Sequence, residues 1–197
     1  KTAELYALAC KPQLPPDPAT VSLWARRMHF LLDQLEAVSR ELEACGEQLE
    51  ELVQQHPDGE LFRSVKGVGT VLSAGLICLF GEDRQAIPDA RVVQCRTGTA
   101  PVTVRSGKST RVYFRRACNK QARNTVQQLA QQLVLHHAWA LELYRAHRIR
   151  GRHYHEALRI VGHHALRVLY AVWRDRQPYD ADRYEAARRR RQAPKAA

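Results

Sequence analysis

The chain has 197 residues and is 45% hydrophobic and 26% charged, a composition that excludes an intrinsically disordered protein. No segment approaches the run of roughly 20 apolar residues that a bilayer-spanning helix needs, so we expect no membrane span. Five widely spaced cysteines without a C-x-x-C pair argue against a disulfide scaffold and a zinc knuckle, and favour reduced thiols in the cytoplasm.

The positive charge is concentrated in one part of the chain. The formal net charge is +11, but residues 1–62 hold 5 Lys and Arg against 11 Asp and Glu, whereas residues 63–197 hold 26 against 9. From Ala90 to Leu141 there is no acidic residue and there are nine basic ones. Because such a stretch cannot neutralise itself, it favours binding to a polyanion such as nucleic acid. A merely basic surface would carry its charge more evenly.

The N-terminal third predicts a linker and a long helix. Residues 1–20 contain four prolines, which predict an extended, proline-rich linker. Residues 21–56 then predict one helix whose apolar residues recur at alternating steps of four and three, the seam of a coiled coil. The seam residues are Trp24, Met28, Leu31, Leu35, Val38, Leu42, Cys45, Leu49 and Leu52. This seam needs a partner helix, so we expect association through residues 24–52, either with a second copy or with another part of a longer protein.

Residues 60–81 resemble a helix-hairpin-helix motif. A short segment from Glu60 to Val65 meets the turn Lys66–Gly69, and an apolar helix over 70–80 follows, ended by Gly81. Gly67 and Gly69 allow a close approach of the backbone to a phosphate, whose charge is favoured at the next helix N-terminus. A tight packing turn without a ligand is the alternative.

The basic stretch predicts a small hairpin. After a short helix between Pro88 and Gly98, the pattern of residues 102–104 alternates and so does that of residues 112–114. The loop between them is basic and contains a glycine, so residues 100–116 predict a two-stranded β-hairpin.

Helices are predicted over residues 119–177. Apolar periodicity favours one amphipathic helix over 122–147 and another after Gly151 that ends before Pro178. Residues 181–197 contain four consecutive arginines and predict a basic tail that is disordered until it meets an acidic partner. The fold class we expect is therefore mainly α, with a long coiled-coil helix followed by a helical domain with a small β-hairpin.

Ser106, at the tip of the predicted hairpin, is the candidate for chemistry. A serine hydroxyl is a poor nucleophile unless its proton is accepted or the transition state is stabilised, and nearby cations stabilise phosphoryl transfer. An ordinary serine in a turn is the alternative. No His and Asp accompany it in a hydrolase arrangement. We predict no metal site, because no carboxylate cluster accompanies His136, His137, His153, His155, His163 and His164.

Several ordered motifs carry a family resemblance over about residues 22–184. They are FRSVKGVG (62–69), FGEDR (80–84), GTAPVT (98–103), RSGKS (105–109), FRRACNK (114–120), the segment 151–158, WRD (173–175) and PY (178–179). Together they resemble the C-terminal half of the insertion-sequence-110/116/902-type transposases, which are recombinases guided by a bridge RNA.

The resemblance implies a function and a set of site residues. It implies that Ser106 attacks a DNA phosphodiester and forms a phosphoserine link. It also implies DNA and guide RNA as partners, with phosphate contacts from Gly67, Gly69, Arg105, Gly107, Lys108, Arg111, Arg115, Arg116, Lys120 and Arg123. Proteins of this family act as dimers and tetramers, and bacterial cytoplasm at the nucleoid is the expected location.

In one respect the chain departs from the family. Members carry an N-terminal RuvC-like domain with four acidic metal ligands, and residues 1–20 offer only Glu4 and Asp17. We therefore expect no cofactor bound by this chain, Mg²⁺ only with a RuvC-like domain in cis or in trans, and no recombination by the chain alone. A non-catalytic helix-hairpin-helix module that binds DNA or RNA and dimerises by its coiled coil is the alternative function. A coiled-coil assembly protein with an incidentally basic body is a third, which the acid-free stretch disfavours.

Overall fold

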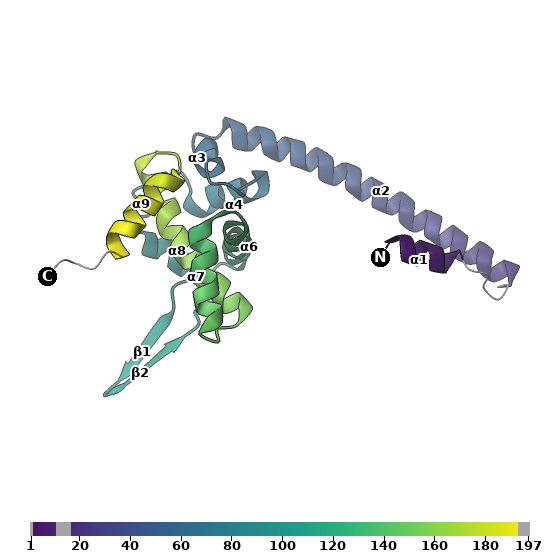
Figure 1. The fold of residues 1–197 in the computed structure, drawn as a ribbon. Coiled ribbons are helices and arrows are strands. Elements are labelled where there is room, and N and C mark those ends of the chain that lie inside the picture. The colour runs from purple at the N-terminus through teal and green to yellow at the C-terminus, as the bar shows by residue number, and fades with distance from the viewer. Residues whose placement is uncertain (1, 11–16, 193–197) are drawn as a thin grey trace. The chain divides into compact units, whose positions relative to one another are not determined.

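The computed structural model describes residues 2–10 and 17–192 and divides into two compact units, residues 1–47 and 48–197. Helices dominate and two short strands form one hairpin, which confirms the expected fold class (Figure 1). No helix within the described ranges is long and apolar enough to cross a membrane.

The first unit contains helix α1 (Thr2–Ala9) and most of helix α2 (Pro18–Gln55). The extended linker predicted over 1–20 is wrong for Thr2–Ala9, because this segment of Ala, Leu and Glu residues has high helix propensity. The prolines at 12, 15 and 16 lie outside the described residues. Pro18 is the first residue of α2, a position that tolerates proline, and the Asp17 carboxylate accepts hydrogen bonds from the Thr20 backbone N–H and hydroxyl, each at 3.1 Å.

Helix α2 agrees with the helix predicted over 21–56. Its seam residues are exposed except Leu49, which is half-buried: Trp24 is 54% accessible, Leu35 62% and Leu42 68%. An apolar stripe of this length in water is unfavourable, so the structure is compatible with the predicted association, which stays a prediction.

The second unit is a helical domain with the hairpin inserted. Its elements are α3 (Gly59–Arg63), α4 (Thr70–Phe80), α5 (Ala90–Arg96), β1 (Val102–Ser106), β2 (Ser109–Tyr113), α6 (Lys120–His136), α7 (Ala138–Ile149), α8 (Tyr154–Asp175) and α9 (Ala181–Gln192). Helix α8 is its centre and contacts α3, α5, α6 and α7. The structure thus contains the short helix predicted before the hairpin, which is α5. It also contains the two helices predicted on either side of the Lys66–Gly69 turn, which are α3 and α4.

Trp173, near the end of α8, anchors this core. It is fully buried, its ring lies 5.3 Å from that of Phe80, and Phe80 lies 5.5 Å from Phe62. The Trp173 Nε1–H donates to the Gly81 carbonyl at 3.2 Å, and the Arg84 guanidinium lies 4.9 Å above the Trp173 ring. These contacts hold α3 and α4 against the C-terminal end of α8.

The single helix predicted over 122–147 is wrong, because the chain breaks at His137 into α6 and α7. His137 has an extended backbone conformation (φ −127°, ψ 123°), is buried, and its Nε2 lies 2.9 Å from the Lys66 carbonyl oxygen. Its ring also contacts Tyr179 edge-on at 5.5 Å. A tertiary contact to the glycine turn therefore outweighs the helical periodicity of the segment.

The disordered tail predicted over 181–197 is wrong for residues 181–192, which form α9. The Asp180 carboxylate accepts a hydrogen bond from the Arg183 backbone N–H at 3.0 Å, and the Tyr184 ring lies 5.2 Å from Trp139. An ion pair of 2.8 Å joins Arg188 to Glu142 of α7. Ordering thus comes from contacts within the chain. Residues 193–197 lie outside the described residues.

His164 makes stability dependent on pH. Burial, and then the charge of Arg167, lowers its pKa from 6.5 to about 4. Because the unfolded chain binds the proton more tightly, the stability contributed by neutral His164 is complete above pH 6.5 and is lost as the pH falls towards 4. We expect His164→Asn to reduce the fall in melting temperature between pH 7 and pH 5, measured by circular dichroism. His29→Asn, on exposed α2, is the matched control, and an equal effect of both would contradict the assignment.

Candidate nucleic-acid interface

Ser106 lies at the tip of an exposed hairpin. Strands β1 and β2 are antiparallel, with Ser106 paired to Ser109 and Val102 paired to Tyr113. Two residues, Gly107 and Lys108, connect the strands, and Gly107 has φ +55°, which a glycine adopts without strain. In Figure 1 the hairpin extends away from the helices of the second unit. The predicted β-hairpin and its glycine-containing basic tip are therefore present.

The strand register sorts the basic side chains onto two faces. Residues that pair directly across antiparallel strands share a face, and residues two apart on one strand share it too. Val104 pairs with Arg111, so Arg111 lies on the same face as Ser106 and Ser109. Arg105 pairs with Thr110 and lies on the opposite face. Of the two strand arginines predicted beside Ser106, only Arg111 shares its face.

The remaining predicted cations divide by exposure. Lys108 in the turn, Arg116 after β2 and Lys120 at the start of α6 are exposed and available to a ligand. Arg115 and Arg123 instead hold the protein's own backbone: the Arg115 Nε–H donates to the Ala100 carbonyl at 3.2 Å, and one Nη of Arg123 donates to the Arg115 and Arg116 carbonyls at 3.2 and 3.1 Å. These two residues close the foot of the hairpin, and their contact with phosphate stays a prediction.

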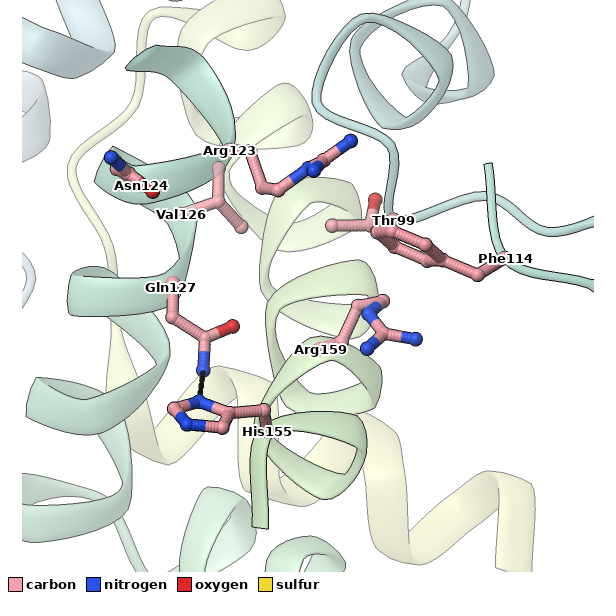
Figure 2. A pocket seen from close by; sticks show the side chains of 8 residues that line it. All are labelled: Thr99, Phe114, Arg123, Asn124, Val126, Gln127, His155 and Arg159. Atoms are coloured by element: carbon pink, nitrogen blue, oxygen red, sulfur yellow. Dashed lines mark hydrogen bonds between the residues drawn. The ribbon is translucent and has the colours of Figure 1, made fainter. Parts of the chain in front are cut away.

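A cavity of about 290 Å³ lies at the foot of the hairpin, where the end of β2 meets α6 and α8. Figure 2 shows its lining, which consists of Thr99, Phe114, Arg123, Asn124, Val126, Gln127, His155 and Arg159. No carboxylate belongs to this lining among the described residues.

Two guanidinium groups flank the Phe114 ring in this cavity. The Arg159 guanidinium carbon lies 4.1 Å from the ring centroid and that of Arg123 lies 4.8 Å from it, one above and one below the ring in the view of Figure 2. Burial lowers the pKa of Arg159, the charge of the nearby Glu156 opposes this shift, and the charge of Arg123 adds a smaller lowering. Because neither arginine has an ion-pair partner within the described ranges, the cavity has a positive wall that an anion would neutralise.

Sequence reasoning named His155 only as a surface or phosphate-contacting side chain, and it missed Arg159 and the cavity role of Phe114. The first two lie on α8, some 40 residues from Phe114 along the chain, and only the tertiary fold brings them together. The available signal was weak: His155 and Arg159 are four residues apart and therefore share a face of a predicted helix.

The two glycines of the 66–69 turn have different environments. Gly67 has φ +90°, and a Cβ there would lie 2.4 Å from the His136 side chain, so this glycine is needed for packing. Gly69 precedes α4 with φ −89° and has open space around it. Of the two glycines, only Gly69 has open space beside it, and its contact with a phosphate stays a prediction.

A carboxylate already lies beside the first residue of α4. Glu50 accepts hydrogen bonds from the Arg63 guanidinium and the Thr70 hydroxyl. These bonds, Arg63 foremost, lower the pKa of Glu50 to about 2. Among residues 2–10 and 17–192 no group of three or more His, Cys, Asp or Glu side chains is placed to hold a metal ion.

Comparison with known proteins gives a family match within the second unit and one curated relative. Residues 59–145 match the model of the transposase IS116/IS110/IS902 family. The chain is also 31% identical, over 91 residues, to a protein named as the mini-circle transposase of IS117 in Streptomyces coelicolor. That match covers 46% of this chain and 22% of the relative, so the matched region spans about a fifth of the length of the curated relative. The family match includes the hairpin and ends before α8.

Substitution of each glycine in the 66–69 turn tests which of the two is needed for packing. We expect Gly67→Ala to lower the free energy of unfolding by about 1–3 kcal/mol, because alanine is strained at positive φ and its Cβ meets His136. Gly69→Ala, the matched control, should cost less than about 1 kcal/mol, since it changes only a helix cap. Urea denaturation measures both. Equal losses would contradict the different environments of the two glycines.

Proposed function

Because residues 59–145 are part of a transposase domain of the IS116/IS110/IS902 family, we propose that this chain binds DNA and exchanges its strands with the Ser106 hydroxyl as nucleophile. The observation that carries the proposal is the place of Ser106: it lies within the matched residues, at the tip of an exposed and basic hairpin. An exposed tip can reach a phosphodiester that a buried serine cannot.

The chemical step conserves phosphate ester bonds. The Ser106 Oγ attacks the phosphorus of one phosphodiester, and the new Oγ–P bond forms as a P–O bond to deoxyribose breaks. The hydroxyl proton is taken up by an acceptor outside this chain, and the sugar oxygen that leaves receives a proton in return. Rejoining is the reverse attack by a sugar hydroxyl of another strand, so no external energy source is needed. Cations on the hairpin stabilise the charge on the phosphate oxygens.

Positioning of the phosphate falls to the hairpin's own cations. Arg111 shares the face of Ser106, and Lys108 lies in the adjoining turn. Arg105, on the other face, is placed for a neighbouring phosphate of the same duplex. The acid-free stretch from Ala90 to Leu141 surrounds these residues with positive charge, which favours DNA through release of its counterions.

Other components complete the reaction. The structure records no hydrogen bond from the Ser106 side chain within the described residues, so its proton acceptor comes from elsewhere. We assign that task to the acidic site of a RuvC-like domain, in cis or in trans, with Mg²⁺ held there and not by this chain. A guide RNA would read the DNA sequence by base pairing, which leaves backbone contacts to the protein.

Covalent trapping tests the nucleophile. We would mix the chain with end-labelled DNA that carries a candidate junction, guide RNA, Mg²⁺ and a separately expressed RuvC-like domain, and then separate products on a denaturing gel. We expect a protein–DNA adduct that Ser106→Ala abolishes. Ser109→Ala, which removes the directly paired hydroxyl on the same face, should keep the adduct within about fivefold, because a change below about 1 kcal/mol in the barrier is at most about fivefold in rate.

Two outcomes would overturn the catalytic assignment. An adduct that persists in Ser106→Ala would place the nucleophile elsewhere. No adduct, with salt-sensitive DNA binding retained, would favour the second candidate, a non-catalytic binding module. The missing hydrogen bond at Ser106 is the observation that favours this candidate.

The exposed seam of α2 is proposed to join copies of the chain. We expect Leu35→Glu to shift the protein towards monomer in sedimentation velocity, because a carboxylate placed in an apolar seam is desolvated without a partner. Gln34→Glu introduces the same charge one residue away, outside the seam, and should leave the oligomer unchanged. A monomeric wild-type chain at micromolar concentration would contradict self-association.

A further inference from the structure

The cavity at the foot of the hairpin has three kinds of lining group. Phe114 presents an aromatic ring that is 39% exposed. Arg123 and Arg159 supply positive charge without a carboxylate in the lining. Asn124 and Gln127, on one face of α6, add amide groups. These groups match the parts of one nucleotide. The ring can stack on the base, the guanidinium groups can neutralise the phosphate, and the amides can form hydrogen bonds with the edge of the base.

We propose that this cavity binds one unpaired nucleotide of a single strand of DNA or RNA. The base stacks on Phe114 in the place that the Arg159 guanidinium has now. Arg159 turns to the phosphate, beside Arg123. The proposal rests on the nucleic-acid binding proposed above and not on the role of Ser106.

The charges around the Phe114 ring favour this exchange. Arg159 and Arg123 have like charges on one small ring, and burial takes solvent away from Arg159. A phosphate between them replaces repulsion by two charge-assisted hydrogen bonds. The stacked base then replaces the contact between the Arg159 guanidinium and the Phe114 ring.

The size of the cavity selects a single nucleotide. At about 290 Å³ it lies at the small end of ligand pockets, which run from about 300 to 1,000 Å³. A stacked base pair does not fit, so a duplex would have to open or present an extruded base. This requirement separates the cavity from the basic hairpin surface, which a duplex backbone can contact without unpairing.

The position of the cavity connects it to the hairpin. Phe114 follows Tyr113, the last residue of β2, so the hairpin tip lies about 17 Å from the cavity along five strand residues. That is about the rise of five nucleotides in one DNA strand at 3.4 Å each. A strand that lies along the hairpin therefore reaches the cavity.

Two adjacent aromatic residues allow a matched test. Phe114 lines the cavity, whereas Tyr113, at 48% exposure, points to one face of the hairpin and does not line it. We would measure binding of fluorescein-labelled dT12, rU12 and a 12-bp duplex by anisotropy, using the full chain. We expect Phe114→Leu to weaken single-strand binding about tenfold, the loss of one stacked base, with duplex binding unchanged. Tyr113→Leu, on the hairpin face that carries Ser106, should not weaken single-strand binding more than duplex binding.

A second pair of variants controls for folding. Arg159→Gln should weaken single-strand binding more than duplex binding, whereas Arg167→Gln removes the same charge from the same helix, outside the cavity. Melting temperatures identify any variant that does not fold. Loss confined to dT12 or to rU12 identifies the source of the nucleotide as DNA or RNA, and either supports the proposal.

Three results would overturn it. Single-strand binding unchanged in Phe114→Leu and Arg159→Gln would exclude the cavity, and equal weakening for the duplex would indicate a backbone contact. Wild-type binding to the duplex without binding to dT12 or rU12 would also overturn it while leaving DNA binding intact. Conversely, pocket-dependent single-strand binding without a Ser106 adduct would support this inference and contradict the serine mechanism.

Discussion

Burial of Trp173 against the aromatic pair Phe62 and Phe80 is the interaction on which the second unit depends. It fastens the C-terminal end of α8 to α3 and α4, while the other end of the same helix carries His155 and Arg159. Fourteen residues separate Arg159 from Trp173, about 21 Å along a helix. Because a helix is stiff over that length, the hydrophobic anchor at one end decides where the charged cavity forms at the other.

Elements with a local cause were predictable from the sequence. The Gly107 turn between alternating strands, the end of α4 at Gly81 and the long apolar repeat of α2 each depend on residues close together in the chain. Apart from α1, which follows from local helix propensity, the errors arose where contacts between residues far apart in the chain decide the structure. His137 leaves the helix because the Lys66 carbonyl binds its ring, and α9 forms because Tyr184 packs on Trp139. No short-range pattern contains these partners.

In the candidate site, too, some residues could be predicted from local sequence and others could not. Ser106 and the cations next to it follow from one short motif, and the strand register then separates Arg105 from Arg111. Arg159 could not be assigned, since its relation to Phe114 exists only after α8 has packed. The acid-free stretch explains why the hairpin and α6 bring no carboxylate to the cavity: both come entirely from residues 90–141. Helix α8 contributes Arg159, and also Glu156, whose charge acts on Arg159 from outside the lining.

The hairpin also acts as a lever arm with Phe114 at its fulcrum. Over five strand residues, a rotation of about 10° at the foot moves the Ser106 hydroxyl by about 3 Å. A misplacement of about 1 Å can cost a reaction about a hundredfold in rate. Small rearrangements of Arg123 and Arg159 around the ring therefore produce larger displacements at the tip, and the rigidity of the foot sets how accurately Ser106 is positioned for the proposed reaction.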